Sequence, residues 1–234
     1  MKSFLFYVVL ISSVILTACK GEAPKESAPA PEATQPAASA AHEKSLPKII
    51  AFGDSLTAGY GLPVEQSYPS LLENKLDQDG LKYEVVNAGV SGDTSAGGLA
   101  RIDWALEGDV RIVILELGAN DILRGQPIAA MKKNLGDIIA RVKSHGAEVL
   151  LAGMEAPTNM GIQYRMAVHD AYQSLARERK VAFIPFFLER VAGIESLNQP
   201  DRIHPNAEGT KIVAETVYKS LKPELEKQSR RAAN

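Results

Sequence analysis

The chain has 234 residues, of which 45% are hydrophobic and 23% are charged, an ordinary balance for a globular protein. Its formal net charge of -2 excludes the strongly basic surface that a nucleic-acid partner usually requires. The length allows one domain of ordinary size once the two ends of the chain are set aside.

The N-terminus carries the features of an export signal. Lys2 precedes the apolar run FLFYVVLISSVIL, which is followed by small residues and by Cys19, the only cysteine in the chain. The run is shorter than the about 20 apolar residues of a membrane-spanning helix, and small residues at its end are typical of a secretory signal. The pattern predicts a signal peptide over residues 1–18, with an uncleaved membrane anchor as the alternative.

Cys19 needs its own explanation, because a single cysteine in an exported protein cannot form an internal disulfide. The segment LTAC that ends at Cys19 resembles the lipobox of bacterial lipoproteins. The resemblance implies that Cys19 is acylated and becomes the mature N-terminus, where several acyl chains give stable anchoring. It implies an exported protein that faces the periplasm. By resemblance to enterobacterial lipoproteins, Lys20 after the cysteine, in place of Asp, implies the outer rather than the inner membrane.

Residues 19–46 contain the lipobox cysteine and then a segment rich in Ala, Pro, Ser and Glu, with no aromatic residue. Such a segment cannot bury enough apolar surface to offset the entropy lost on ordering. We therefore expect a disordered tether, partly extended by its prolines. His42 lies within this tether and is not expected to be catalytic.

From residue 47 onward, β-rich runs alternate with segments of helical periodicity. The expected strands are 48–55, 83–90, 111–121, 147–154 and 181–187. The expected helices are 67–80, 95–108, 127–146, 161–180 and 205–221. Runs this apolar suit strands that are covered on both faces, so the alternation predicts a three-layer α/β fold with a mainly parallel, five-stranded sheet. This domain is expected over 47–222, followed by a fraying polar tail over 223–234.

Three of the expected strands end in small or polar residues. Ser55 lies at the end of the first strand, Gly89 at the end of the second and Asn120 at the end of the third. Because ligands of such folds bind at the carboxyl ends of the strands, we expect these residues to share one site. Asp201 and His204 come just before the last helix, where a turn can bring the carboxylate to the imidazole.

These segments resemble the four sequence blocks of the GDSL, or SGNH, hydrolase family. FGDSLTAGYG, NAGVSGDT, LGANDILRG and DRIHPNAEG occur in the order of that family. The resemblance covers about residues 47 to 222, and GLARIDWAL and NDILRG make it closest to the subgroup of thioesterase I, lysophospholipase L1 and arylesterase. It implies a flavodoxin-like SGNH hydrolase fold, an α/β/α sandwich, and a serine hydrolase without a cofactor.

The residue types agree with this chemistry. A serine hydroxyl is a weak nucleophile unless a base takes its proton, and His204 is the candidate base for Ser55 because imidazole titrates near neutral pH. Asp201 can hold the second ring nitrogen. The resemblance implies that the backbone N–H groups of Ser55 and Gly89 and the side-chain amide of Asn120 are the oxyanion-hole donors.

Several of the polar residues also have structural explanations. Ser55 could be a helix N-cap, and Asp54 is expected to cap the turn that presents Ser55. Asp121 is expected to be a turn or cap residue. His145 lies at a predicted helix C-terminus and His169 inside a predicted helix, so neither is expected to be catalytic.

Other kinds of site find little support. Asp201 and His204 could bind a metal ion, but neither an HExxH pair nor a cysteine cluster accompanies them, so no metal is expected. The glycine-rich segment TAGYG lacks the GK[ST] of a phosphate-binding loop. A flavin or nucleotide site would rest on fold analogy alone.

Two loops are expected to form an apolar acyl pocket. The expected lining is Ile122, Leu123, Met154, Pro157, Met160 and Tyr164. The leading hypothesis is a monomeric esterase, thioesterase or lysophospholipase that acts on small acyl esters or lipids through an acyl-enzyme. The alternatives are a carbohydrate O-acetyl esterase and a lipoprotein that binds without turnover.

Overall fold

The computed structural model describes residues 46–232, and every structural statement below concerns this range. It lies within one compact unit, Lys44–Asn234. The expected signal peptide (1–18), Cys19 and all but the last residue of the tether (19–46) lie outside the described residues.

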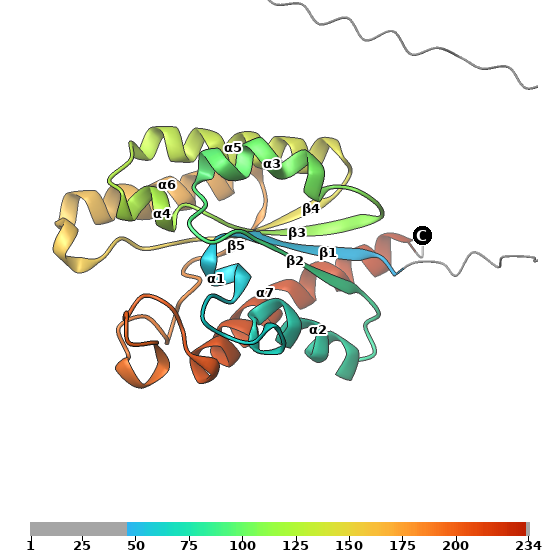
Figure 1. Cartoon of the computed structure of the whole chain (residues 1–234). Helices are drawn as coiled ribbons and strands as arrows, with labels where there is room; N and C mark the ends of the chain where they lie inside the picture. The colour runs from blue at the N-terminus through green and yellow to red at the C-terminus, as the bar shows by residue number, and fades with distance from the viewer. Residues whose placement is uncertain (1–45, 233–234) are drawn as a thin grey trace, which may run out of the picture. The chain divides into compact units, whose positions relative to one another are not determined.

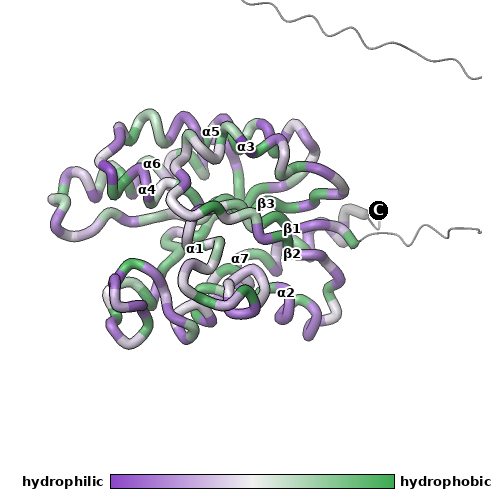
Figure 2. Tube along the Cα trace, viewed as in Figure 1, coloured by the Kyte–Doolittle hydropathy of each residue, from purple (hydrophilic) through white to green (hydrophobic). Residues whose placement is uncertain are grey.

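A parallel sheet of five strands forms the centre of the domain, as predicted. Its strands are β1 (Lys48–Gly53), β2 (Glu84–Gly89), β3 (Val110–Glu116), β4 (Glu148–Ala152) and β5 (Ala182–Ile184). Every residue of β3 except Arg111 is buried, as expected for a strand covered on both faces. Figure 2 agrees: the trace at β3 is largely green, whereas the trace of α5 alternates between green and purple.

Helices cover both faces of the sheet, so the three-layer α/β/α architecture is confirmed (Figure 1). Their bounds are α1 (Ser55–Ala58), α2 (Tyr68–Gln78), α3 (Ser95–Ala105), α4 (Ala119–Leu123), α5 (Ile128–Ser144), α6 (Ile162–Arg179) and α7 (Ala207–Ala232). Helices α3, α5 and α6 lie on one face, and α2 and α7 lie on the other. Single 3₁₀ turns occupy Val64–Gln66, Thr158–Met160 and Glu195–Leu197.

The strand order is β2-β1-β3-β4-β5. From β1 the chain moves outward to β2 and then crosses back to β3 on the other side of β1. The carboxyl ends of β1 and β3 therefore flank the topological switch point, where open α/β sheets bind their ligands. Ser55 follows β1 and Asn120 follows β3, so the fold brings both residues to this point.

The C-terminal boundary differs from the sequence prediction. We expected a fraying tail after residue 222, but α7 continues through Pro223 to Ala232. Leu221 and Leu225, on either side of the proline, are almost completely buried. The free energy gained by burying these two side chains offsets the loss of the backbone hydrogen bond that a proline removes from a helix interior.

Within residues 46–232, no helix is both long and apolar enough to cross a membrane.

Candidate active site

Ser55 lies at the sharp turn between β1 and the short helix α1. Asp54 caps this helix, because its Oδ1 accepts a hydrogen bond from the backbone N–H of Leu56 at 3.0 Å. The capping role expected for Asp54 is therefore confirmed, and Ser55 is the first helical residue rather than the N-cap. The turn presents the half-buried Ser55 at the carboxyl edge of the sheet.

The loop before α7 brings an imidazole and a carboxylate to Ser55. The Nε2 atom of His204 lies 2.9 Å from Ser55 Oγ, and its Nδ1 lies 2.7 Å from Asp201 Oδ2. The other oxygen of Asp201 accepts from the backbone N–H groups of Ile203 and His204 at 3.0 and 3.1 Å. Tyr60, which the sequence analysis missed, packs on the imidazole with a distance of 4.7 Å between ring centroids.

The ionisation of Asp201 fixes the hydrogen-bond direction through the imidazole. The hydrogen bond from His204, with those from the backbone N–H groups, lowers the pKa of Asp201 to about 2. The ionised carboxylate can only accept, so Nδ1 carries the proton and Nε2 is free to accept from the Ser55 hydroxyl. A hydroxyl, an imidazole and a carboxylate in this series can activate the hydroxyl as a nucleophile.

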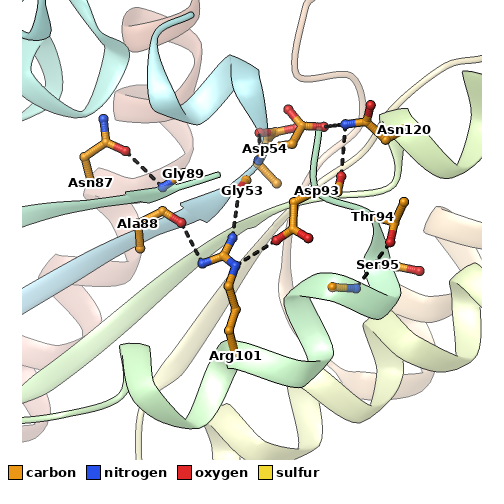
Figure 3. Close-up of polar contacts among 12 residues, drawn as sticks. Gly53, Asp54, Asn87, Ala88, Gly89, Asp93, Thr94, Ser95, Arg101 and Asn120 are labelled. Carbon is orange, nitrogen blue, oxygen red and sulfur yellow. Dashed lines mark hydrogen bonds and ion pairs between the residues drawn. The ribbon is translucent and has the colours of Figure 1, made fainter. Parts of the chain in front are cut away.

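The amide of Asn120, in the first turn of α4, lies beside the nucleophile turn (Figure 3). Its Nδ2 donates to Asp54 Oδ2 at 3.0 Å and to the backbone oxygen of Asp93 at 2.9 Å. The N–H of Gly89, at the end of β2, donates to Asn87 Oδ1 at 3.0 Å. A Cβ at Gly89 would overlap the backbone of α1, so only glycine allows this close approach.

A buried acidic pair under the nucleophile turn was not foreseen. Glu116, the last residue of β3, is fully buried, and its Oε2 accepts from Thr57 Oγ1 at 2.7 Å and from Asp54 N at 3.3 Å. Burial raises the pKa of Glu116 well above its ordinary value, and the neighbouring Asp54 raises it further. Burial also raises the pKa of Asp54, to about 6. The sequence did contain a signal for this pair, because Glu116 is an acidic residue inside the apolar run RIVILELG.

Asp121 acts as a cap from a distant part of the chain. Its two oxygens accept from the backbone N–H and the hydroxyl of Ser95, at 2.8 and 2.6 Å, at the start of α3. His145 is the C-cap of α5, and His169 is exposed on α6. The structural explanations expected for these three residues are therefore confirmed.

A mainly apolar cavity of about 460 Å³ adjoins the nucleophile turn through Leu56. Four of the expected lining residues are present: Ile122, Leu123, Met154 and Pro157. Met160 and Tyr164 are not on the lining, which corrects the prediction. Both pack partly buried against the core, and the Tyr164 hydroxyl donates to the backbone oxygen of Ile122 at 3.4 Å. Lining residues not foreseen include Phe186, Leu188 and Arg165.

In the described part of the chain, no three His, Cys, Asp or Glu side chains are grouped so that they could hold a metal ion. The hydrogen-bonded series of serine, histidine and aspartate, beside an apolar cavity, defines the class of serine hydrolases.

Comparison with known proteins narrows this class. A model of the GDSL-like lipase/acylhydrolase family matches residues 51–212. Esterase TesA of Pseudomonas aeruginosa is 42% identical over 178 residues, which are 76% of this chain and 89% of that protein. Thioesterase 1/protease 1/lysophospholipase L1 of Escherichia coli is 39% identical over 176 residues, 75% of this chain and 83% of that protein. A crystal structure of TesA, 41% identical, matches with a TM-score of 0.73 over 75% of this chain and 98% of its own.

The chain belongs to the GDSL-like lipase/acylhydrolase family, as the sequence blocks indicated, and is an enzyme that hydrolyses ester bonds.

Proposed function

We propose that this chain cleaves acyl esters, among them aryl esters, acyl-thioesters and lysophospholipids, through an acyl-enzyme on Ser55. The hydrogen-bonded series from Ser55 Oγ through His204 to Asp201 is the observation that carries the proposal. The names of the relatives, esterase and thioesterase 1/lysophospholipase L1, support esters, thioesters and lysophospholipids as substrates.

In the first half of the reaction, Ser55 Oγ attacks the acyl carbon while His204 Nε2 takes the hydroxyl proton. The imidazolium that forms is stabilised by the ionised Asp201. The same proton then passes to the leaving alcohol or thiol, which departs and leaves the acyl group on Ser55. In the second half, His204 takes a proton from water, and the resulting hydroxide attacks the acyl carbon. The bond to Ser55 Oγ then breaks, Ser55 receives the proton from His204, and the acyl group leaves as a carboxylic acid.

The negative charge on the acyl oxygen needs donors that are already in place. We assign this role to the backbone N–H groups of Ser55 and Gly89 and to the amide of Asn120. The Gly89 N–H points to Asn87 Oδ1, and the Nδ2 hydrogens of Asn120 point to Asp54 and Asp93. The acyl oxygen therefore replaces one of these acceptors at each of the two donors when it binds.

The size and lining of the cavity favour a substrate with a longer acyl chain over one with an acetyl group. Its volume of about 460 Å³ and its lining by Ile122, Leu123 and Met154 suit a flexible apolar chain. This supports an acyl esterase over a carbohydrate O-acetyl esterase.

Hydrolysis of p-nitrophenyl esters from acetate to palmitate by the purified chain and its Ser55→Ala variant tests the proposal. We expect activity that is higher on medium or long acyl chains than on acetate and is lost in Ser55→Ala. Activity on acetate alone would favour the O-acetyl esterase, and no turnover of esters or thioesters would favour a binding protein.

We also propose that the chain is exported and anchored to the outer membrane through acylated Cys19, and that it acts in the periplasm as a monomer. The apolar run followed by LTAC supports this proposal. Mass spectrometry of the membrane-bound chain should find a mature N-terminus at Cys19 that carries a diacylglycerol. A Cys19→Ser variant should be released from the membrane fraction, and its unchanged retention would contradict the proposal.

A further inference from the structure

Arg101 on α3 reaches back to the carboxyl edge of the sheet, where it binds three oxygen atoms (Figure 3). Its Nε donates to Asp93 Oδ2 at 2.7 Å, its Nη1 to Ala88 O at 2.9 Å and its Nη2 to Gly53 O at 2.9 Å. The guanidinium carbon lies 4.0 Å from the centroid of the Phe52 ring. Three acceptors and one aromatic face fix the orientation of this group.

Two of these acceptors belong to strand ends that carry oxyanion donors. Gly53 is the last residue of β1, two positions before Ser55, and Ala88 directly precedes Gly89 at the end of β2. The guanidinium thus bridges the ends of two adjacent strands, beside the hydrogen bond at 3.0 Å from Val90 N–H to Gly53 O that continues the ladder between them. It adds a side-chain link between the two segments that carry the backbone N–H groups.

The third donor is reached through Asp93. Its carboxylate binds Arg101, while its backbone oxygen accepts from Asn120 Nδ2 at 2.9 Å. The ion pair is sheltered, because the Arg101 and Asp93 side chains are only 19% and 11% exposed. A pair with so little solvent contact is weakly screened by salt and holds its position better than a surface pair.

We propose that Arg101 is a positioning residue for ester hydrolysis, because it binds the two strand ends that carry the backbone oxyanion donors and also Asp93, which holds the third donor, Asn120. This inference rests on the proposed function. A lysine ammonium, which is a compact point charge, cannot hold three acceptors in one plane.

Kinetics of Arg101→Ala and Arg101→Lys on one p-nitrophenyl ester test the inference. The matched control is Arg141→Ala. Arg141 also binds α3, through Leu99 O at 3.3 Å and Asp103 at 2.7 Å, but neither acceptor is a strand end.

For Arg101→Ala we expect kcat to fall about 10- to 100-fold, since small displacements of catalytic groups cost this much. KM should change little, because the acyl cavity is lined by other residues. Arg101→Lys should be intermediate, and millimolar guanidinium should restore part of the activity of Arg101→Ala. Arg141→Ala should keep the wild-type kcat. If Arg101→Ala does not fold, the test uses Arg101→Lys instead. The melting temperature of this variant is measured as well, to show that it folds like the wild type.

A double-mutant cycle with Asn120→Ala separates positioning from general destabilisation. Asn120→Ala alone should lose about 100- to 1000-fold in kcat, as for other side-chain oxyanion donors. If Arg101 acts through the donors, the double variant should lose less than the product of the two single losses. The inference would be overturned if the loss of kcat in the double variant equalled the product of the two single losses. It would also be overturned if a folded Arg101 variant kept the wild-type kcat. A wild-type chain that cleaves no ester would instead overturn the proposed function.

Discussion

Asp201 accepts three hydrogen bonds, from the His204 ring and from the backbone N–H groups of Ile203 and His204. These bonds lower its pKa to about 2. The carboxylate stays ionised until the pH falls toward this value, so we do not expect its titration to limit activity near neutral pH. In the proposed mechanism, its two roles are to keep the proton on Nδ1 and to stabilise the imidazolium.

Asp201→Asn should lower kcat about 10⁴-fold with the melting temperature almost unchanged, because an amide neither fixes the tautomer nor neutralises the imidazolium. Steady-state kinetics and a thermal melt check this expectation. Asp170→Asn, at an exposed carboxylate on α6, is the control and should be fully active. An Asp201→Asn enzyme with more than about a tenth of wild-type kcat would contradict the assigned role.

The buried pair of Glu116 and Asp54 makes stability depend on pH. Burial raises the pKa of Glu116 well above its ordinary value of 4.5, and that of Asp54 from 3.8 to about 6. A carboxyl group with a raised folded-state pKa stabilises the fold fully below its unfolded-state pKa. The contribution is lost as the pH rises through the folded-state pKa. The loss from Asp54 should therefore occur between about pH 4 and pH 6.

Glu116→Gln should flatten this dependence, because the amide oxygen can still accept from Thr57 but carries no charge. From about pH 5 to about pH 8, the melting temperature of the variant should fall less than that of wild type. Glu65→Gln, at an exposed glutamate, should follow the wild-type profile. Parallel profiles for Glu116→Gln and wild type would show that Glu116 does not titrate as its burial requires.

At the residue scale, the sequence predicted contacts between residues of one local motif, but it did not predict contacts between residues that lie far apart in the chain. Asp201 and His204 are three positions apart, so one turn could join them, and the structure shows the bond. Glu116 was missed because its partner Thr57 lies 59 positions away in the sequence. Arg101 was missed because two of its three acceptors are backbone oxygens, which no residue type reveals. Tyr164 was placed in the cavity on hydropathy alone, which does not give the direction of a side chain.

At the scale of elements, α7 gives a clear test, because its last turns were expected to fray. Leu225 is 1% exposed, and Gln228 Nε2 donates to the backbone oxygen of Arg111 at 3.1 Å. Leu225→Ala should therefore lower the free energy of unfolding by about 2 to 5 kcal/mol, measured by urea denaturation.

Lys227→Ala, at an exposed side chain of the same turn, is the control and should change stability by less than about 0.5 kcal/mol. A similarly small effect of Leu225→Ala would mean that the last turns do fray and that the expected boundary at 222 was right.

The longer elements could be predicted, because burial on one or two faces leaves a periodic pattern in the sequence. Helix α5 was expected over 127–146 and spans Ile128–Ser144. The short helices α1 and α4 were not predicted, since four or five residues show no helical period. They are nevertheless the elements that carry Ser55 and Asn120.

At the scale of the whole molecule, the alternation of strands and helices predicted the three layers and the parallel sheet. It did not predict the strand order, because hydropathy says which faces are covered and not which strands are neighbours. The order β2-β1-β3-β4-β5 is that of flavodoxin-like folds, so the family resemblance supplied what the pattern lacked. This order places the two segments with Ser55 and Asn120 side by side.

The central claim is that Ser55 is the nucleophile of an ester hydrolase, and titration with a p-nitrophenyl alkylphosphonate tests it most directly. We expect a burst of one equivalent of p-nitrophenol per chain, loss of esterase activity, and a phosphonyl group on the peptide that contains Ser55. Ser55→Ala should show neither the burst nor the label. Ester hydrolysis that persists in Ser55→Ala, or a label on another residue, would contradict the account.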